Sequence, residues 1–216
     1  GDTFDIHIGG IEHIPVHHTN EIAQSECATG MPYVNYWMHN NHLLDTTGKM
    51  SKSNGDFLTV STHNKKGYDP LAYRYFLMGA NYRKELAFSF EALDAASTAY
   101  KKLLTWSQEH RTTEGAVHGN YKERFFSALF DDLGTPTAIA ELWNCIKDDS
   151  VNDSDTYATI IMMSKVLGLG LENAKKEVIT IPEIVQALLE KRTLARASKD
   201  FTLSDTLRDE IATHGF

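Results

Sequence analysis

Hydrophobic and polar residues follow two different periods along the chain, and the period changes near residues 62–68. Before this break, apolar residues gather in short runs typical of strands, at residues 4–8 and 33–41, with a short continuation at 43–45. The segment at residues 20–30 has the length and spacing of a helix. We expect residues 4–8 to form a buried strand, and the whole region to be the end of an α/β sheet.

After the break, apolar residues recur every three or four positions, which is typical of amphipathic helices. Asp69 is placed to cap the first of these helices, and Pro70 suits its first position, where the missing N–H costs nothing. The same order of cap and proline recurs ahead of two later segments. The pattern predicts six helices, at residues 71–79, 90–110, 137–148, 155–167, 183–198 and 203–214.

The two patterns together predict an α/β region followed by an all-α region, with the boundary between residues 66 and 67. The helices are expected to pack as a bundle. The segments at residues 111–120 and 168–180 are polar and contain glycine. We therefore expect them to be surface connections rather than linkers between domains.

Composition narrows the class of protein without fixing its function. The 216 residues suffice for one or two domains, and a hydrophobic content of 42% is enough for buried cores. No apolar run approaches the roughly 20 residues of a membrane span. Cys27 and Cys145 fit no metal or disulfide spacing, so reduced thiols and a cytoplasmic protein are expected. The net charge of -8 argues against broad affinity for nucleic acid but allows a local basic strip.

The most informative stretch for chemistry is a short basic segment followed by Asn54 and Gly55. It contains two flexible cations three residues apart, bracketed by small hydroxyl side chains, and such a loop can hold a triphosphate while it is cleaved. A solvated turn is the alternative for an arbitrary pair of lysines at this spacing. The segment consists of Lys49, Met50, Ser51, Lys52 and Ser53.

A second candidate is the pair His17 and Glu21, which are four residues apart and so lie on one face of a helix. An imidazole nitrogen and a carboxylate oxygen in this register can bind one divalent metal, and they suit zinc. A hydrogen bond on the helix surface is the alternative for an isolated pair of this kind.

The basic segment resembles KMSKS, the second signature of class I aminoacyl-tRNA synthetases. Upstream, residues 4–12 read FDIHIGGIE, residues 17–25 read HHTNEIAQS, and residues 34–39 read VNYWMH. In this order they resemble the FDIHGGG, HHENEIAQS and VNYWMH segments of cysteinyl-tRNA synthetases. The resemblance is dense over residues 4–62 and continues more diffusely through the helices.

This resemblance implies the C-terminal portion of a cysteinyl-tRNA synthetase. Residues 1–66 would be the last part of a class I nucleotide-binding, Rossmann-like catalytic domain. Residues 67–216 would be a helical tRNA-binding bundle, which we expect to be truncated at its C-terminus. The first signature of the family, HIGH, is absent from the chain, so the isolated chain is expected to be inactive without the N-terminal half of the enzyme.

The resemblance also assigns the metal and the substrate pocket. His17 and Glu21 match two of the family's zinc ligands, and the other two are cysteines expected upstream of residue 1. Zinc that binds the sulfur of the amino acid would separate cysteine from serine by bond chemistry, whereas a pocket alone offers only about 1–3 kcal/mol per missing group. The residues that orient ligands and substrate are matched by His7, His18, Trp37 and His39.

For ATP, the resemblance points to Gly9 and Gly10, which allow a close backbone approach, and to Glu12, which stands where the family has an aspartate facing the ribose. Lys49 to Ser53 would grip the phosphates together with Mg²⁺, and Lys49 and Lys52 would stabilise the departing pyrophosphate. Ile8 and Thr19 depart from the family pattern, which affects the geometry of the pocket rather than the assignment.

The expected partners are ATP, L-cysteine and tRNA(Cys), with Arg74, Arg83 and Lys84 as candidate contacts to phosphate. Two other readings stay open. One is a cysteine ligase that joins cysteine to an amino sugar in the synthesis of low-molecular-weight thiols. The other is a noncatalytic RNA-binding module, which would have no reason to keep the basic segment.

Overall fold

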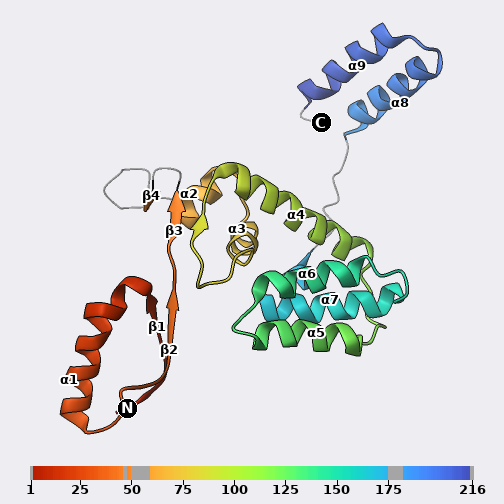
Figure 1. Cartoon of the computed structure of the whole chain (residues 1–216). Coiled ribbons are helices and arrows are strands. Elements are labelled where there is room, and N and C mark those ends of the chain that lie inside the picture. The colour runs from red at the N-terminus through yellow and green to blue at the C-terminus, as the bar shows by residue number, and fades with distance from the viewer. Residues whose placement is uncertain (1, 46–47, 50–58, 175–181, 215–216) are drawn as a thin grey trace. The chain divides into compact units, whose positions relative to one another are not determined.

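The computed structural model describes residues 2–45, 48–49, 59–174 and 182–214, with the backbone alone at residues 45, 48 and 49. It divides into two compact units, Gly1–Lys175 and Lys176–Phe216, which are described separately (Figure 1). The division falls inside residues 168–180, so the prediction that this segment is not a linker between domains is wrong. The boundary expected at residues 66 and 67 lies within the first unit and stays a prediction.

The first unit opens with a two-stranded parallel sheet. Strand β1 (Phe4–Gly10) pairs with β2 (Val34–Asn40) in a register that runs from Phe4 opposite Val34 to Gly10 opposite Asn40. Parallel strands need a crossover, and here it is helix α1 (Thr19–Thr29). Gly30 ends α1 with φ of 70°, a left-handed conformation that glycine adopts without strain.

The predicted strand at residues 4–8 is present, but the prediction that it is buried is wrong. His7 faces α1, and therefore its neighbours Phe4, Ile6 and Ile8 point to the opposite face of the sheet. Their exposed fractions are 49%, 55% and 65%. Strands of a parallel sheet are buried when both faces are covered, and within the described residues a helix covers only one.

A second small sheet follows directly. Strand β3 (Leu43–Asp45) pairs antiparallel with β4 (Gly48–Lys49) and parallel with β5 (Leu86–Ala87). Helix α2 (Val60–Lys65) begins at Thr59, whose hydroxyl accepts a hydrogen bond from the backbone N–H of Thr62. The sequence pattern did not predict this helix.

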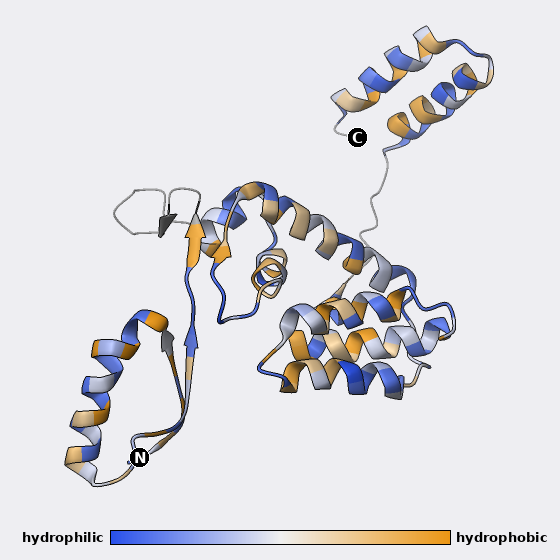
Figure 2. Ribbon diagram, viewed as in Figure 1, coloured by the Kyte–Doolittle hydropathy of each residue, from blue (hydrophilic) through white to orange (hydrophobic). Residues whose placement is uncertain are grey.

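The remaining helices of the first unit form a bundle. Apolar and polar residues alternate along each of these helices (Figure 2). Asp69 caps α3 as predicted, accepting a hydrogen bond of 2.7 Å from the backbone N–H of Leu71. Fully buried side chains from four helices, Leu103, Phe125, Leu142 and Met163, meet in the core. The helices are α3 (Pro70–Leu77), α4 (Phe90–Glu109), α5 (Gly119–Phe130), α6 (Thr135–Ile146) and α7 (Asp153–Leu167).

The second unit is a hairpin of helices α8 (Glu183–Ala197) and α9 (Phe201–Thr213). Its core is small and consists of Val185, Leu188, Ala195, Leu207 and Ile211. All six predicted helices are thus present close to their predicted bounds, whereas α5 was missed. Among the described residues, no helix is long and apolar enough to cross a membrane.

Candidate metal and substrate site

Six of the predicted site residues meet at the junction of β1, β2 and the start of α1. After β1 the chain makes a 3₁₀ turn (Ile11–His13) and a π-helical turn (Ile14–His18) before α1 begins. The π-helical turn carries His17 and His18, and β1 and β2 supply His7 and His39. The local fold therefore concentrates imidazole groups around one carboxylate, Glu21 of α1.

Glu21 lies between two histidines. Its Oε1 is 3.5 Å from His17 Nε2, so the predicted pair does lie on one face of the turn. Its Oε2 is 3.2 Å from His7 Nε2, and within the described part of the chain this buried oxygen has no hydrogen-bond partner. A carboxylate oxygen left in this state is costly, and a bound cation would satisfy it. These residues therefore fit the zinc predicted for the site.

His18 is the most buried histidine of this group, with 4% of its surface exposed. Its Nδ1 lies 2.8 Å from Nε2 of His39, in hydrogen-bond contact. Burial, and after it the neighbouring His39 and His7, hold the pKa of His18 below its usual value. His18 is accordingly neutral near pH 7, the state in which an imidazole can bind a metal.

Trp37 forms one wall of the cluster. Its ring centroid lies 4.9 Å from that of His7 and 4.8 Å from that of His18, and its ring is parallel to His39 at 5.9 Å. The structure thus brings together all four residues that were predicted to orient the substrate. Their role in orienting a substrate stays a prediction.

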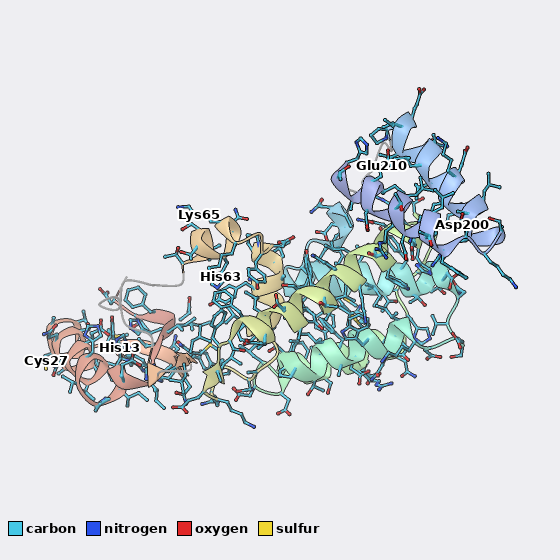
Figure 3. The ribbon with its side chains drawn as sticks, turned by 90° about the horizontal axis from the view of Figure 1, so that it is seen from above. His13, Cys27, His63, Lys65, Asp200 and Glu210 are labelled. Atoms are coloured by element: carbon cyan, nitrogen blue, oxygen red, sulfur yellow. The ribbon has the colours of Figure 1, made fainter. Side chains whose placement is uncertain are left out.

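A fifth histidine, His13, joins the cluster although it was not predicted as a site residue; it lies in the N-terminal part of the chain (Figure 3). Its ring centroid is 5.1 Å from that of His17 and 5.3 Å from that of His18. The signal was present in the sequence, because His13 and His17 have the same spacing of four as His17 and Glu21.

The residues predicted for the nucleotide occupy the same turn. A Cβ atom on Gly9 would lie 2.5 Å from His18 Cε1, and one on Gly10 would collide with the Glu12 carboxylate. Buried His18 therefore favours glycine at position 9, whereas the flexible end of the Glu12 side chain could move away from a Cβ at position 10. Glu12 Oε2 lies 3.6 Å from His42 Nε2. The ATP-binding role of these three residues stays a prediction.

The basic segment is only partly described. Lys49 contributes its backbone to β4, and its side chain lies outside the described residues, as do Met50, Ser51, Lys52 and Ser53. Their roles stay predictions.

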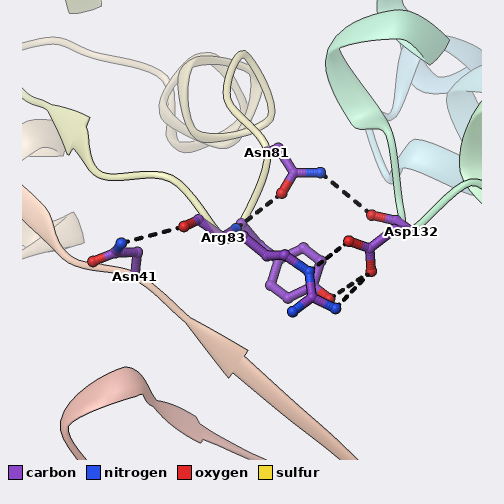
Figure 4. Close-up of polar contacts among 5 residues, drawn as sticks. Asn41, Asn81, Arg83 and Asp132 are labelled. Atoms are coloured by element: carbon purple, nitrogen blue, oxygen red, sulfur yellow. Dashed lines mark hydrogen bonds and ion pairs between the residues drawn. The ribbon is translucent and has the colours of Figure 1, made fainter.

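Two of the three arginine and lysine residues considered for RNA have partners within the protein. Arg83 forms an ion pair with Asp132, with Nε to Oδ2 at 2.5 Å, and Tyr82 donates a hydrogen bond of 2.7 Å to the same carboxylate (Figure 4). Hydrogen bonds from Arg83 and Tyr82 lower the pKa of Asp132. Arg74 donates from Nε to the carbonyl of Leu167 at 2.7 Å. These contacts occupy some of the N–H groups of each guanidinium.

Comparison with known proteins agrees with the family that the sequence resembles. Residues 1–98 match the family described as the tRNA synthetases class I (C) catalytic domain. "Cysteine--tRNA ligase 1" of Burkholderia lata is 42% identical over 221 residues, covering 100% of this chain and 46% of that protein. "Cysteine--tRNA ligase" of Novosphingobium aromaticivorans is 41% identical over 238 residues, covering 100% of this chain and 48% of its own length.

A solved structure, the LeuRS-tRNA-LeuAMS ternary complex of Agrobacterium radiobacter K84, has a similar fold, with a TM-score of 0.55 at 14% identity. It covers 79% of this chain and 26% of its own. This confirms the predicted fold class, a Rossmann-like remnant followed by helices. The chain spans about half the length of the curated relatives it matches.

Proposed function

Because the chain belongs to the cysteinyl-tRNA synthetase family, we propose that it forms part of an enzyme that activates L-cysteine with ATP and attaches it to tRNA(Cys) in the cytoplasm. The observation that carries this proposal is the cluster around Glu21, where His7 and His17 flank one half-buried carboxylate beside the ring of Trp37. A sulfur-selecting metal and a small amino acid both fit such a site.

Zinc would be held by His17 and Glu21, with the two cysteines expected upstream completing the set. When bound, zinc supplies a Lewis acid that prefers a thiolate to the hydroxyl of serine. The neutral ring of His18 and the indole of Trp37 limit the space beside it and keep the substrate oriented.

The residues proposed to bind ATP would carry out the activation of cysteine. The carboxylate of cysteine attacks the α-phosphorus of ATP, an oxygen–phosphorus bond forms, and pyrophosphate leaves. Lys49 and Lys52 stabilise the charge that develops on pyrophosphate, with Mg²⁺ sharing that charge. Gly9, Gly10 and Glu12 hold the nucleoside. A ribose hydroxyl of tRNA then attacks the carbonyl of cysteinyl-adenylate, and AMP leaves.

The helical region would hold tRNA. A groove of about 360 Å³ runs along one face of α4. Lys101 and Lys102 are exposed there beside Trp106, which is a combination suited to phosphate and base or ribose contacts. Because Arg74 and Arg83 have protein partners, these two lysines and Lys84 are the better candidates.

The exposed face of β1 is where the rest of the enzyme would pack. Phe4, Ile6 and Ile8 on β1 and Tyr36 on β2 are all at least 49% exposed. Contiguous apolar surface of this kind in a sheet is typical of an interface. We therefore propose that the N-terminal half of the enzyme covers this face, and that the isolated chain is inactive.

A chimera tests the proposal. Residues 1–216 would replace the matching segment of the Burkholderia lata relative, and charging of tRNA with cysteine would be measured against ligation of cysteine to an amino sugar. The proposal expects charging of tRNA only. Ligation to the amino sugar without charging would favour the alternative, which the names of the curated relatives do not favour. Binding of tRNA with no activation of cysteine would favour the noncatalytic module.

A further inference from the structure

Three consecutive residues, Asn81, Tyr82 and Arg83, join the end of β2 to the turn between α5 and α6 (Figure 4). On the β2 side their partner is Asn41, the residue directly after the strand. Its backbone N–H donates to the carbonyl of Tyr82 at 2.8 Å, and its side-chain amide donates to the carbonyl of Arg83 at 3.2 Å. The backbone of this segment is therefore fixed to the end of β2.

The side chains of the same segment all contact one residue of the turn, Asp132. Arg83 donates from Nε to Oδ2 and, at 3.1 Å, from Nη2 to Oδ1, so the ion pair is bidentate. Tyr82 donates to Oδ1 at 2.7 Å, and the amide of Asn81 donates to the Asp132 carbonyl at 3.3 Å. A bidentate pair of this kind fixes direction as well as distance. The contacts of residues 81–83 with Asn41 and Asp132 together form what we call the clasp.

The turn that the clasp holds is strained. Asp132 and Leu133 have φ angles of 51° and 53°, in the left-handed region that residues other than glycine rarely adopt. Such conformations persist where surrounding contacts over-determine them. The ion pair is exposed, with 60% of the Arg83 side chain and 46% of the Asp132 side chain accessible, so it adds little to stability. The clasp therefore contributes direction more than stability.

The clasp lies between the two regions that the proposed reaction must bring together. Asn41 stands between His39 of the histidine cluster and His42, which contacts Glu12. On the other side, α5 and α6 share one apolar core with the rest of the bundle that is proposed to hold tRNA. The bundle also meets the strands through apolar packing, where Leu43 of β3 contacts the cluster around the N-terminus of α4. Apolar packing is non-directional, whereas the clasp is directional.

We propose that the clasp sets the orientation of the helical bundle relative to the candidate substrate site. Arg83 and Asp132 are then positioning residues for the transfer of cysteine to tRNA and not for its activation. Activation needs only small substrates, which bind on the β2 side of the clasp. Transfer also needs the end of tRNA, whose path depends on how the bundle is oriented. The role in transfer rests on the proposed function, whereas the fixed orientation does not.

Distances within the purified chain test the orientation directly. One spin label on the exposed Cys27 of α1 and a second on Glu123→Cys, at an exposed position of α5, span the clasp, and Cys145 is buried. Double electron–electron resonance should give one narrow distribution of distances. Asp132→Asn should widen it, because the charge that holds the bidentate pair is lost. The matched control Arg124→Gln breaks an exposed ion pair of 2.9 Å between α5 and α6, inside the bundle, and should leave the width unchanged.

Activity of the chimera tests the role in transfer. Arg83→Gln and Asp132→Asn should each lower charging of tRNA by about 2- to 30-fold, the range found for residues that couple two sites. Both should leave cysteine-dependent ATP–pyrophosphate exchange within about twofold of wild type. The double variant should be no worse than either single variant, because both changes remove the same contact. Arg124→Gln should keep both activities.

Three outcomes would overturn the proposal. One is an unchanged width of the distance distribution in Asp132→Asn, and another is an equal loss of exchange and charging in Arg83→Gln. The third is a loss of charging in Arg83→Gln with wild-type or stronger charging in Asp132→Asn, which would make Arg83 a direct contact to RNA phosphate. A chimera that neither activates cysteine nor charges tRNA would refute the proposed function instead, and the distances in the chain would still decide whether the clasp fixes the orientation.

Discussion

Replacing His63 with leucine should stabilise the first unit. His63, labelled in Figure 3, is 1% exposed, and neither of its ring nitrogens has a hydrogen-bond partner among the described residues. Its neighbours are aromatic: the ring stacks on Tyr73 at 4.6 Å and lies 5.5 Å from Phe88. A polar ring of α2 is thus enclosed by aromatic side chains.

The magnitude follows from three contributions. A buried donor or acceptor without a partner costs about 1–3 kcal/mol, so the two nitrogens together cost roughly 2–6 kcal/mol. Leucine removes that cost but loses the ring stacking on Tyr73, worth about 0.5–1.5 kcal/mol. Imperfect fit of the new side chain costs up to about 1.5 kcal/mol. With the middle of each range, we expect His63→Leu to raise the free energy of unfolding by about 2 kcal/mol.

Urea unfolding followed by circular dichroism measures this change, and for a unit of this size each kcal/mol should raise the melting temperature by about 2–4 °C. His110→Leu is the matched control. His110 also stacks on a neighbouring ring, Trp106, at 4.6 Å, but its Nδ1 contacts the Trp106 carbonyl at 2.9 Å. The control should therefore lose about 0.5–1.5 kcal/mol. A lower urea midpoint for His63→Leu would refute the reasoning.

Three further predictions concern activity, RNA and pH. In the chimera, Lys52→Ala should lower cysteine-dependent ATP–pyrophosphate exchange by roughly 10²–10³, the scale of one preorganised charge, and near wild-type exchange would remove Lys52 from that role. Changing Lys101 and Lys102 to glutamate should weaken tRNA binding and reduce the slope of log affinity against log salt by about 2; an unchanged slope would exclude the α4 groove. Hydrogen bonds, first that from Ser150, lower the pKa of Asp148 to about 2. Since this pKa is below that of the unfolded chain, the stabilisation is present above about pH 4 and is lost as the pH falls toward 2. Asp148→Asn should remove that part of the acid dependence, as urea unfolding at pH 2–5 would show, and an unaltered pH profile would contradict it.

Local patterns were sufficient for much of the fold. The cap and proline at Asp69 and Pro70 predicted the start of α3, because a cap is set by residues adjacent in sequence. Helix α5 was missed although Tyr121, Phe125 and Ala128 repeat at helical spacing and are buried. The predicted connection ended at residue 120, and the residues that follow it were assigned to no element.

The burial of β1 and the contacts of Glu21 could not be predicted from local patterns, because both depend on residues distant in the sequence. The apolar run of β1 predicted burial, yet Ile6 and Ile8 are exposed within the described structure because one face of the sheet has no covering layer. The spacing of His17 and Glu21 predicted one contact correctly. It could not show that His7, from a strand more than ten residues away, lies closer to the same carboxylate.

The most direct test of the central claim is amino-acid-dependent ATP–pyrophosphate exchange by the chimera, with L-cysteine compared with L-serine. The chimera isolates the contribution of this chain, because the remainder comes from the Burkholderia lata relative. The account predicts exchange with cysteine and none above background with serine. Equal exchange with both amino acids, or exchange with neither in a folded chimera, would contradict it.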